Sequence, residues 1–231
     1  FLIALHWVTF FQAIKISNVS VTLACLSSAS LFTSILEPLI FKRKIDPTEL
    51  FFGSMVVVGL VLIFSFETEY ATGIIMALTS AFLASLFTVI NGRLIQKENP
   101  YRISLVEMIG GVLGISIWLG LSGKIGFNMI DIPASDWFWI LILGIVCTGF
   151  AFVASVKVME ELTPFTVSLT INLEPVYGII LAFFIFCSSE EMTFGFYVGT
   201  VLILGALYLN ALKKKGKLPF RKAVVRRETN D

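Results

Sequence analysis

The sequence predicts an all-α, polytopic membrane protein with eight transmembrane helices. Hydrophobic residues make up 57% of the 231 positions and charged residues 14%, whereas soluble domains contain about 45–50% and about 25%. The mean hydropathy is +0.90, and the apolar runs approach the roughly 20 residues with which a helix crosses a bilayer. Residues 50 to 66 are apolar on every side, while a membrane strand would alternate. These observations exclude a soluble domain and favour helices.

Eight apolar runs define the predicted helices in order. They cover residues 2 to 16, 19 to 41, 50 to 66, 71 to 94, 103 to 121, 137 to 159, 164 to 187 and 194 to 212. Charged or aromatic connections separate them, because such residues are costly in hydrocarbon and gather at its interfaces. In chain order these are Lys15; Lys42, Arg43 and Lys44; Glu67 and Glu69; Arg93, Lys97 and Arg102; Asp131 and Asp136, then Trp137 and Trp139; Lys157; Glu190 and Glu191; and a basic tail.

The basic residues are sorted to one side of this arrangement. Short loops rich in lysine and arginine stay in the cytoplasm. If the C-terminal tail is cytoplasmic, all of the 17 lysines and arginines except Lys15 and Lys124 lie on that side. We therefore expect a multi-pass protein of the cell (inner) membrane with a cytoplasmic C-terminus. The tail is expected to attract anionic lipid headgroups, and the net charge of +1 gives no indication of nucleic-acid binding.

An internal repeat relates the two parts of the chain. The segment from Trp7 to Val61 is rebuilt from Phe152 to Leu207, with Lys15 matching Lys157 and a short insertion near residues 159 to 163. In each copy the lysine precedes a helix rich in small polar residues, an acidic pair and two glycines. The glycines are Gly53 and Gly59 in the first copy, and Gly199 and Gly205 in the second.

The second copy has two additional helices ahead of its matching part. We therefore expect two further helices upstream of Phe1 and a complete arrangement of five plus five. Because five is odd, the halves must cross the membrane in opposite directions, as inverted-topology repeats do. The predicted organisation is a truncated first repeat of three helices (residues 1–66), a second repeat of five (71–212) and a basic cytoplasmic tail (213–231).

These residues resemble a known family. The stretch from Gly149 to Ile185, with its helix entry Leu162-Thr163-Pro164 and its core Asn172-Leu173-Glu174-Pro175, looks like the second half of an EamA-type permease of the drug/metabolite transporter superfamily. The stretch from Ala4 to Glu49 resembles helices three and four of the first half. The resemblance implies a ten-helix permease with both termini cytoplasmic and a substrate cavity between its halves. It also implies transport of small polar metabolites, commonly the export of amino acids or related compounds.

Glu174 is the most informative single position. It falls near the middle of the helix predicted over 164 to 187, where an ionisable side chain is costly unless paired or hydrated. Pro175 has no N–H and clashes with the carbonyl of Ile171, so the helix is expected to bend there. Freed backbone at that depth must line a cavity or find a partner. Glu174 is therefore the candidate for substrate binding or proton coupling, and the alternative is a carboxyl that packs against a neighbouring helix.

Further polar residues accompany Glu174 on its own helix. Thr170 and Tyr177 share its face through i, i+4 and i, i+3 spacing, while Asn172 belongs to a second polar strip. All three are candidate substrate-binding residues.

The matching helix of the first copy carries hydroxyl groups instead. Ser27 and Ser30 begin a stripe that ends at Glu37, and the alignment of the two copies pairs Ser28 with Glu174. Small hydroxyl residues either let helices pack closely or line a cavity, and both interpretations stay open for Ser27 and Ser30. Glu37 is expected near the inner membrane interface beside Lys42 and Arg43.

Three further charged residues are candidates for gates or structural partners. Lys15 and Lys157 lie at helix ends, where long cationic side chains usually reach the headgroups; alternatively, each attracts an anionic group of the substrate. Glu107 lies a turn into its helix and could pair with Arg93 or Lys157.

The glycines and cysteines have ordinary structural explanations. Gly110 with Gly114, and Gly195 with Gly199, have the spacing that permits close helix contact, and the remaining repeat glycines are expected to act similarly. The three cysteines are far apart within apolar runs, which indicates neither a disulfide nor a metal site.

Enzyme chemistry finds little support in the sequence. The one histidine, His6, has no acidic neighbour, so it is interpreted as a core or interfacial residue, and no catalytic residue, metal or cofactor is expected. The predicted function is a secondary transporter, an exporter of small polar metabolites that works by alternating access, with proton coupling and a homodimer left open. The rivals are a membrane receptor, an intramembrane enzyme and a passive channel.

Overall fold

The computed structural model describes the chain except for residues 45–46, 67, 124–125, 127–131, 172–173, 187–191 and 218–231. Its described residues form helices and connections, with no β-strand among them. The helices are α1 (Leu2–Ile16), α2 (Val19–Leu26), α3 (Ala29–Phe41), α4 (Pro47–Phe66), α5 (Ala71–Leu94), α6 (Pro100–Leu121), α7 (Ala134–Leu141), α8 (Ala151–Val158), α9 (Pro164–Ile171), α10 (Glu174–Phe186) and α11 (Phe194–Lys217). A 3₁₀ turn (Thr68–Tyr70) precedes α5, and a π-helix (Ile142–Phe150) joins α7 to α8. The all-α prediction is confirmed.

Local sequence signals account for several helix ends. Asn18 and Asn99 cap α2 and α6 by accepting the N–H groups of Val21 and Tyr101, each at 2.9 Å, which satisfies donors that a helix start leaves unpaired. Prolines 47, 100 and 164 open α4, α6 and α9, where their missing N–H costs nothing. Lys42 ends α3 in the left-handed conformation, with φ of 53°.

One helix predicted as continuous is broken. The segment predicted over 19 to 41 divides into α2 and α3 around Ser27 and Ser28, whose hydroxyls donate to the carbonyls of Ala24 and Cys25. Such local bonds compete with the helical pattern and bend helices. The segment predicted over 164 to 187 is described as α9 and α10, and residues 172 and 173 between them lie outside the described residues.

The helix predicted over 137 to 159 differs in another way. Its middle part, Ile142–Phe150, is a π-helix of nine residues, a form that widens the turn and is rare outside single-turn bulges. The glycines at 144 and 149 lie within it.

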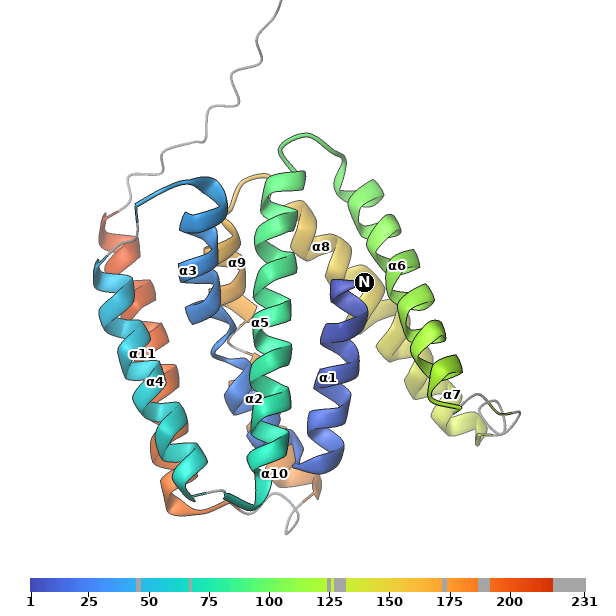
Figure 1. Ribbon diagram of the computed structural model, residues 1–231, viewed down its shortest axis with the longest axis horizontal. Coiled ribbons are helices and arrows are strands. Elements are labelled where there is room, and N and C mark those ends of the chain that lie inside the picture. The colour runs from blue at the N-terminus through green and yellow to red at the C-terminus, as the bar shows by residue number, and fades with distance from the viewer. Residues whose placement is uncertain are drawn as a thin grey trace, which may run out of the picture.

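Helices from the two ends of the chain pack against one another in pairs. α4 lies beside α11, α3 beside α9 and α2 beside α10, with α5 and α1 next to them (Figure 1). Gly59 of α4 lies against Ile203, while Phe66 lies against Gly195. Residue numbers therefore increase along α4 in the direction in which they decrease along α11. The same order holds in the contacts of Leu23 with Gly178, Thr33 with Ser168, and Glu37 with Phe165. All three pairs are therefore antiparallel.

The buried core follows these contacts. Val56 and Ile63 of α4 and Phe196, Ile203 and Ala206 of α11 are fully enclosed. A second part of the core joins residues of α1, α2 and α5, namely Ala13, Val21, Ala24, Cys25, Ile74 and Ala77.

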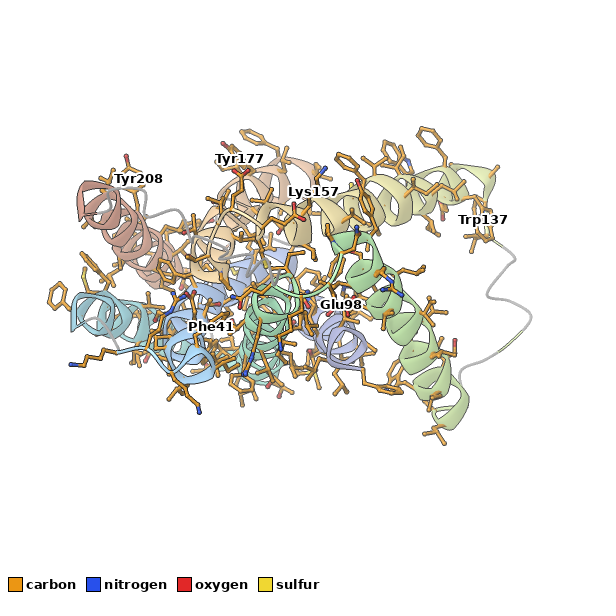
Figure 2. All side chains as sticks on the ribbon, turned by 90° about the horizontal axis from the view of Figure 1, so that it is seen from above. Phe41, Glu98, Trp137, Lys157, Tyr177 and Tyr208 are labelled. Carbon is orange, nitrogen blue, oxygen red and sulfur yellow. The ribbon has the colours of Figure 1, made fainter. Side chains whose placement is uncertain are left out.

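By contrast, α6 and the segment from α7 to α8 splay away from the bundle (Figure 2). Their large apolar side chains are exposed, among them Leu105, Val106, Ile109, Ile145 and Phe150. Apolar surface of this extent is expected to face lipid or a partner.

Four segments of the described chain are long and apolar enough to span a membrane: Val19–Phe41, Thr68–Leu94, Pro100–Leu121 and Ala134–Val158. Leu2–Ile16, Tyr177–Phe186 and Phe194–Ala206 are shorter apolar helices. The expected total of eight spans stays a prediction.

Candidate functional site

A cavity of about 570 Å³ lies among α1, α5, the π-helix, α8, α9 and the start of α10. Its volume is within the usual range for small-molecule sites, about 300–1,000 Å³. Most of its wall is apolar. The polar residues that line it are His6, Ser85, Thr88, Asn91, Thr148, Ser155, Ser168 and Glu174.

Glu174 is the first described residue of α10, because residues 172 and 173 lie outside the described part of the chain. It is exposed and borders the cavity. The cavity therefore contains a carboxyl group that a ligand can reach.

The break between α2 and α3 touches the same cavity. Leu26 and Ala29, which flank this break, both line the cavity. The repeat predicted from the sequence pairs Ser28 of the break with Glu174, which borders the same cavity.

A chain of hydrogen bonds holds this break in place. Ser85 of α5 donates to the Ala29 carbonyl at 2.6 Å, and Thr33 donates to the same carbonyl at 2.8 Å. The Thr33 hydroxyl also lies 3.3 Å from that of Ser168 in α9. These contacts join α3, α5 and α9 beside the break.

The other predicted substrate-binding residues lie elsewhere. Ser27 and Ser30 are buried, with hydroxyls directed to the carbonyls of Ala24 and Ser27, an arrangement that fits the packing interpretation. Thr170 is exposed and donates to the Thr166 carbonyl at 3.0 Å. Tyr177 is exposed and projects from the outer edge of the molecule (Figure 2). The described residues that line the cavity do not include Ser27, Ser30, Thr170 or Tyr177. Asn172 lies outside the described residues.

Glu107 has a partner that the sequence did not suggest. Its carboxylate accepts a hydrogen bond of 3.0 Å from the Asn91 side chain, instead of an ion pair with Arg93 or Lys157, while Arg93 reaches the Ile40 carbonyl at 3.5 Å. Because Asn91 lines the cavity, Glu107 lies one hydrogen bond behind its wall.

Neither of the two lysines paired by the predicted repeat is among the described residues that line the cavity. Lys15 and Lys157 are exposed near the ends of α1 and α8, as expected for side chains that reach the headgroups. Figure 2 shows Lys157 on the outer surface of its helix.

Glu37 connects α3 with α9. As predicted, it lies beside Arg43, with 3.5 Å between Oε1 and Nη1. Its Oε2 also accepts the N–H of Phe165 at 2.9 Å, so this carboxylate caps the start of α9.

Sequence reasoning missed several lining residues. Ser85, Thr88 and Asn91 recur at steps of three along α5, and that spacing places polar groups along one side of an otherwise apolar helix. His6 was interpreted from the sequence as a core or interfacial residue. In the structure His6 is half-buried and lines the cavity. Its Nδ1 atom lies 3.0 Å from the carbonyl oxygen of Ser80 and 2.8 Å from the hydroxyl oxygen of Ser80. The described residues hold no cluster of three metal-ligating side chains.

A family comparison decides the identity of the chain. The model of the EamA-like transporter family matches residues 71–212, which is more than half of the sequence. The chain belongs to the EamA-like transporter family. As an EamA-like protein it is a multi-pass membrane transporter, and the resemblance drawn from the sequence is confirmed.

Two relatives of this EamA-like chain are each described as an uncharacterized transporter. The protein from Archaeoglobus fulgidus is 22% identical, over 92% of this chain and 75% of the relative. That from Clostridium kluyveri is 23% identical, over 88% of this chain and 67% of the relative. A solved crystal structure matches with a TM-score of 0.58 at 17% identity, covering 92% of this chain and 74% of that one, which supports the fold.

Proposed function

We propose that this EamA-like protein is a secondary transporter that exports small polar metabolites, such as amino acids or related compounds, by alternating access. The observation that supports the proposal is a single cavity bordered by Glu174 and by Leu26 and Ala29, which flank the break between α2 and α3. A discontinuous helix beside a cavity is a common feature of transporter binding sites. The substrate would bind in this cavity.

The proposal includes two inverted halves, residues 1–66 and 71–212, followed by the tail 213–231. Its support is the antiparallel packing of repeat-equivalent helices, α4 on α11 and the α2–α3 pair on the α9–α10 pair. Inverted halves that meet in this way can rock about a fixed site. The basic connections favour a cytoplasmic C-terminus in the inner membrane.

Glu174 is the proposed substrate-binding or proton-coupling group. No ATP-binding motif occurs in the sequence, so we expect the energy to come from the substrate gradient or from proton exchange. A carboxyl that can gain and lose a proton beside the substrate provides such a link.

Transport by the full-length protein in proteoliposomes tests the proposal. With a metabolite panel, we expect saturable flux and counterflow, in which an internal substrate accelerates uptake of the labelled one. A passive channel would show flux without saturation or counterflow, and a receptor or enzyme would show no flux; either result would refute the proposal.

The Glu174→Gln variant separates the two roles of the carboxyl. The amide preserves its shape and removes its titration. Loss of pH-driven accumulation with retained substrate exchange indicates a proton carrier, whereas loss of both indicates direct substrate binding. Glu69→Gln, an exposed acidic position in the 3₁₀ turn, is the matched control.

A further inference from the structure

The charges around the cavity are of one sign. Among the described residues that line it, Glu174 is the one carboxylate, and no lysine or arginine occurs. An organic acid placed here would meet a like charge, with no cation to compensate for the loss of water. A cationic group would meet an opposite charge.

Aromatic rings form a continuous section of the wall. The ring of His6 lies 6.1 Å from that of Phe10 and 5.7 Å from that of Phe87, and Phe87 lies 6.1 Å from Phe152. These four rings come from α1, α5 and α8, and all of them line the cavity. Aromatic faces attract cations and accept flat apolar groups.

We propose that the cavity selects an organic monocation, an amine joined to an apolar body about the size of one ring. The ammonium group pairs with Glu174, and the body lies against the ring wall formed by His6, Phe10, Phe87 and Phe152. Organic acids of the same size are rejected. This inference rests on the proposed transport function, because it names the class of substrate for that same cavity.

Calorimetric titration of the full-length protein in detergent tests the selectivity with matched probes. 2-Phenylethylamine and 3-phenylpropanoate share a ring and differ in charge. We expect saturable binding of the amine, at least about tenfold tighter than that of the acid, a difference of about 1.4 kcal/mol. Equal or tighter binding of the acid would overturn the inference.

Two substitutions assign the binding to the cavity. Glu174→Gln should weaken the amine by about tenfold or more, while Glu69→Gln should leave it unchanged. Phe87→Leu should weaken the amine, while Phe138→Leu, at an exposed ring of α7 outside the cavity, should not. Unchanged amine binding in Glu174→Gln would overturn the inference. The same variant also serves as the control for partitioning of the probe into detergent.

Flux measurements separate this inference from the proposed function. Glu174-dependent binding of the amine without flux in proteoliposomes refutes transport but keeps the cavity assignment. Saturable flux of organic acids that persists in Glu174→Gln keeps transport and refutes the assignment.

Discussion

The predicted repeat places Gly59 and Gly205 at equivalent positions, yet a methyl group should affect them in opposite ways. A Cβ at Gly59 would lie 2.8 Å from the carbonyl oxygen of Gly199 and 2.5 Å from Ile203, whereas one at Gly205 meets no described atom within 4 Å. Ile203 can rotate away, but the Gly199 carbonyl belongs to the backbone of α11. Since ordinary contact begins near 3.4 Å, Gly59→Ala should push α4 and α11 apart by roughly half an ångström.

The expected magnitude follows from this overlap. Overpacking of a close interface costs about 1–3 kcal/mol, while alanine in place of a helical glycine contributes about 1 kcal/mol. Gly205→Ala gains only the contribution of alanine in a helix. The difference in the free energy of unfolding between the two variants therefore measures the cost of the overlap at Gly59. A difference of about 1–3 kcal/mol corresponds to roughly 2–12 °C in Tm for a chain of this size. Thermal unfolding in detergent measures it, and equal Tm values for the two variants would refute the argument.

Three further outcomes are expected from thermal unfolding of single variants. Glu37→Ala removes the Oε2 atom that accepts the Phe165 N–H and should cost about 1–2 kcal/mol. Arg43→Ala, at a side chain that is 59% exposed, should cost under about 1 kcal/mol. Equal costs of the two variants would contradict the capping role of Glu37. Asn18→Ala should cost about 1 kcal/mol through loss of the α2 cap, and Asn18→Ser should restore most of it; failure of serine to do so would show that the cap is not the cause. Ser85→Ala should cost only about 0.6 kcal/mol, because Thr33 still bonds the Ala29 carbonyl, and a much larger loss would mean that Thr33 does not compensate.

The helices were predictable because their signals are local. Apolar length, the prolines at helix starts and the charged connections fix where Pro100–Leu121 or Ala71–Leu94 begins and ends, and each of these can be recognised without knowing its neighbours. The break at Ser27 and Ser28 was not predicted, because its serines occur in many unbroken membrane helices. Only their bonds to Ala24 and Cys25, together with Ser85 from another helix, distinguish the break.

The candidate site was only partly predictable for a similar reason. Glu174 was evident because an ionisable residue deep in an apolar run is costly and therefore informative. The face of a helix that borders a cavity depends on its rotation against its neighbours, so Tyr177 shares the helical face of Glu174 in sequence terms but projects outward. The glycines divide in the same way: Gly114, Gly195 and Gly199 lie in close contacts as expected, whereas the prediction for Gly205 was wrong because nothing described approaches it.

The break between α2 and α3 and the predicted site at Glu174 bring different chemistry to the cavity. Glu174 supplies a carboxyl group that borders the cavity. At the break, the hydroxyls of Ser27 and Ser28 donate to the backbone carbonyls of Ala24 and Cys25, so this side adds no charge. Among the described lining residues the cavity therefore has one carboxylate, and a single cationic group is the ligand that would neutralise it.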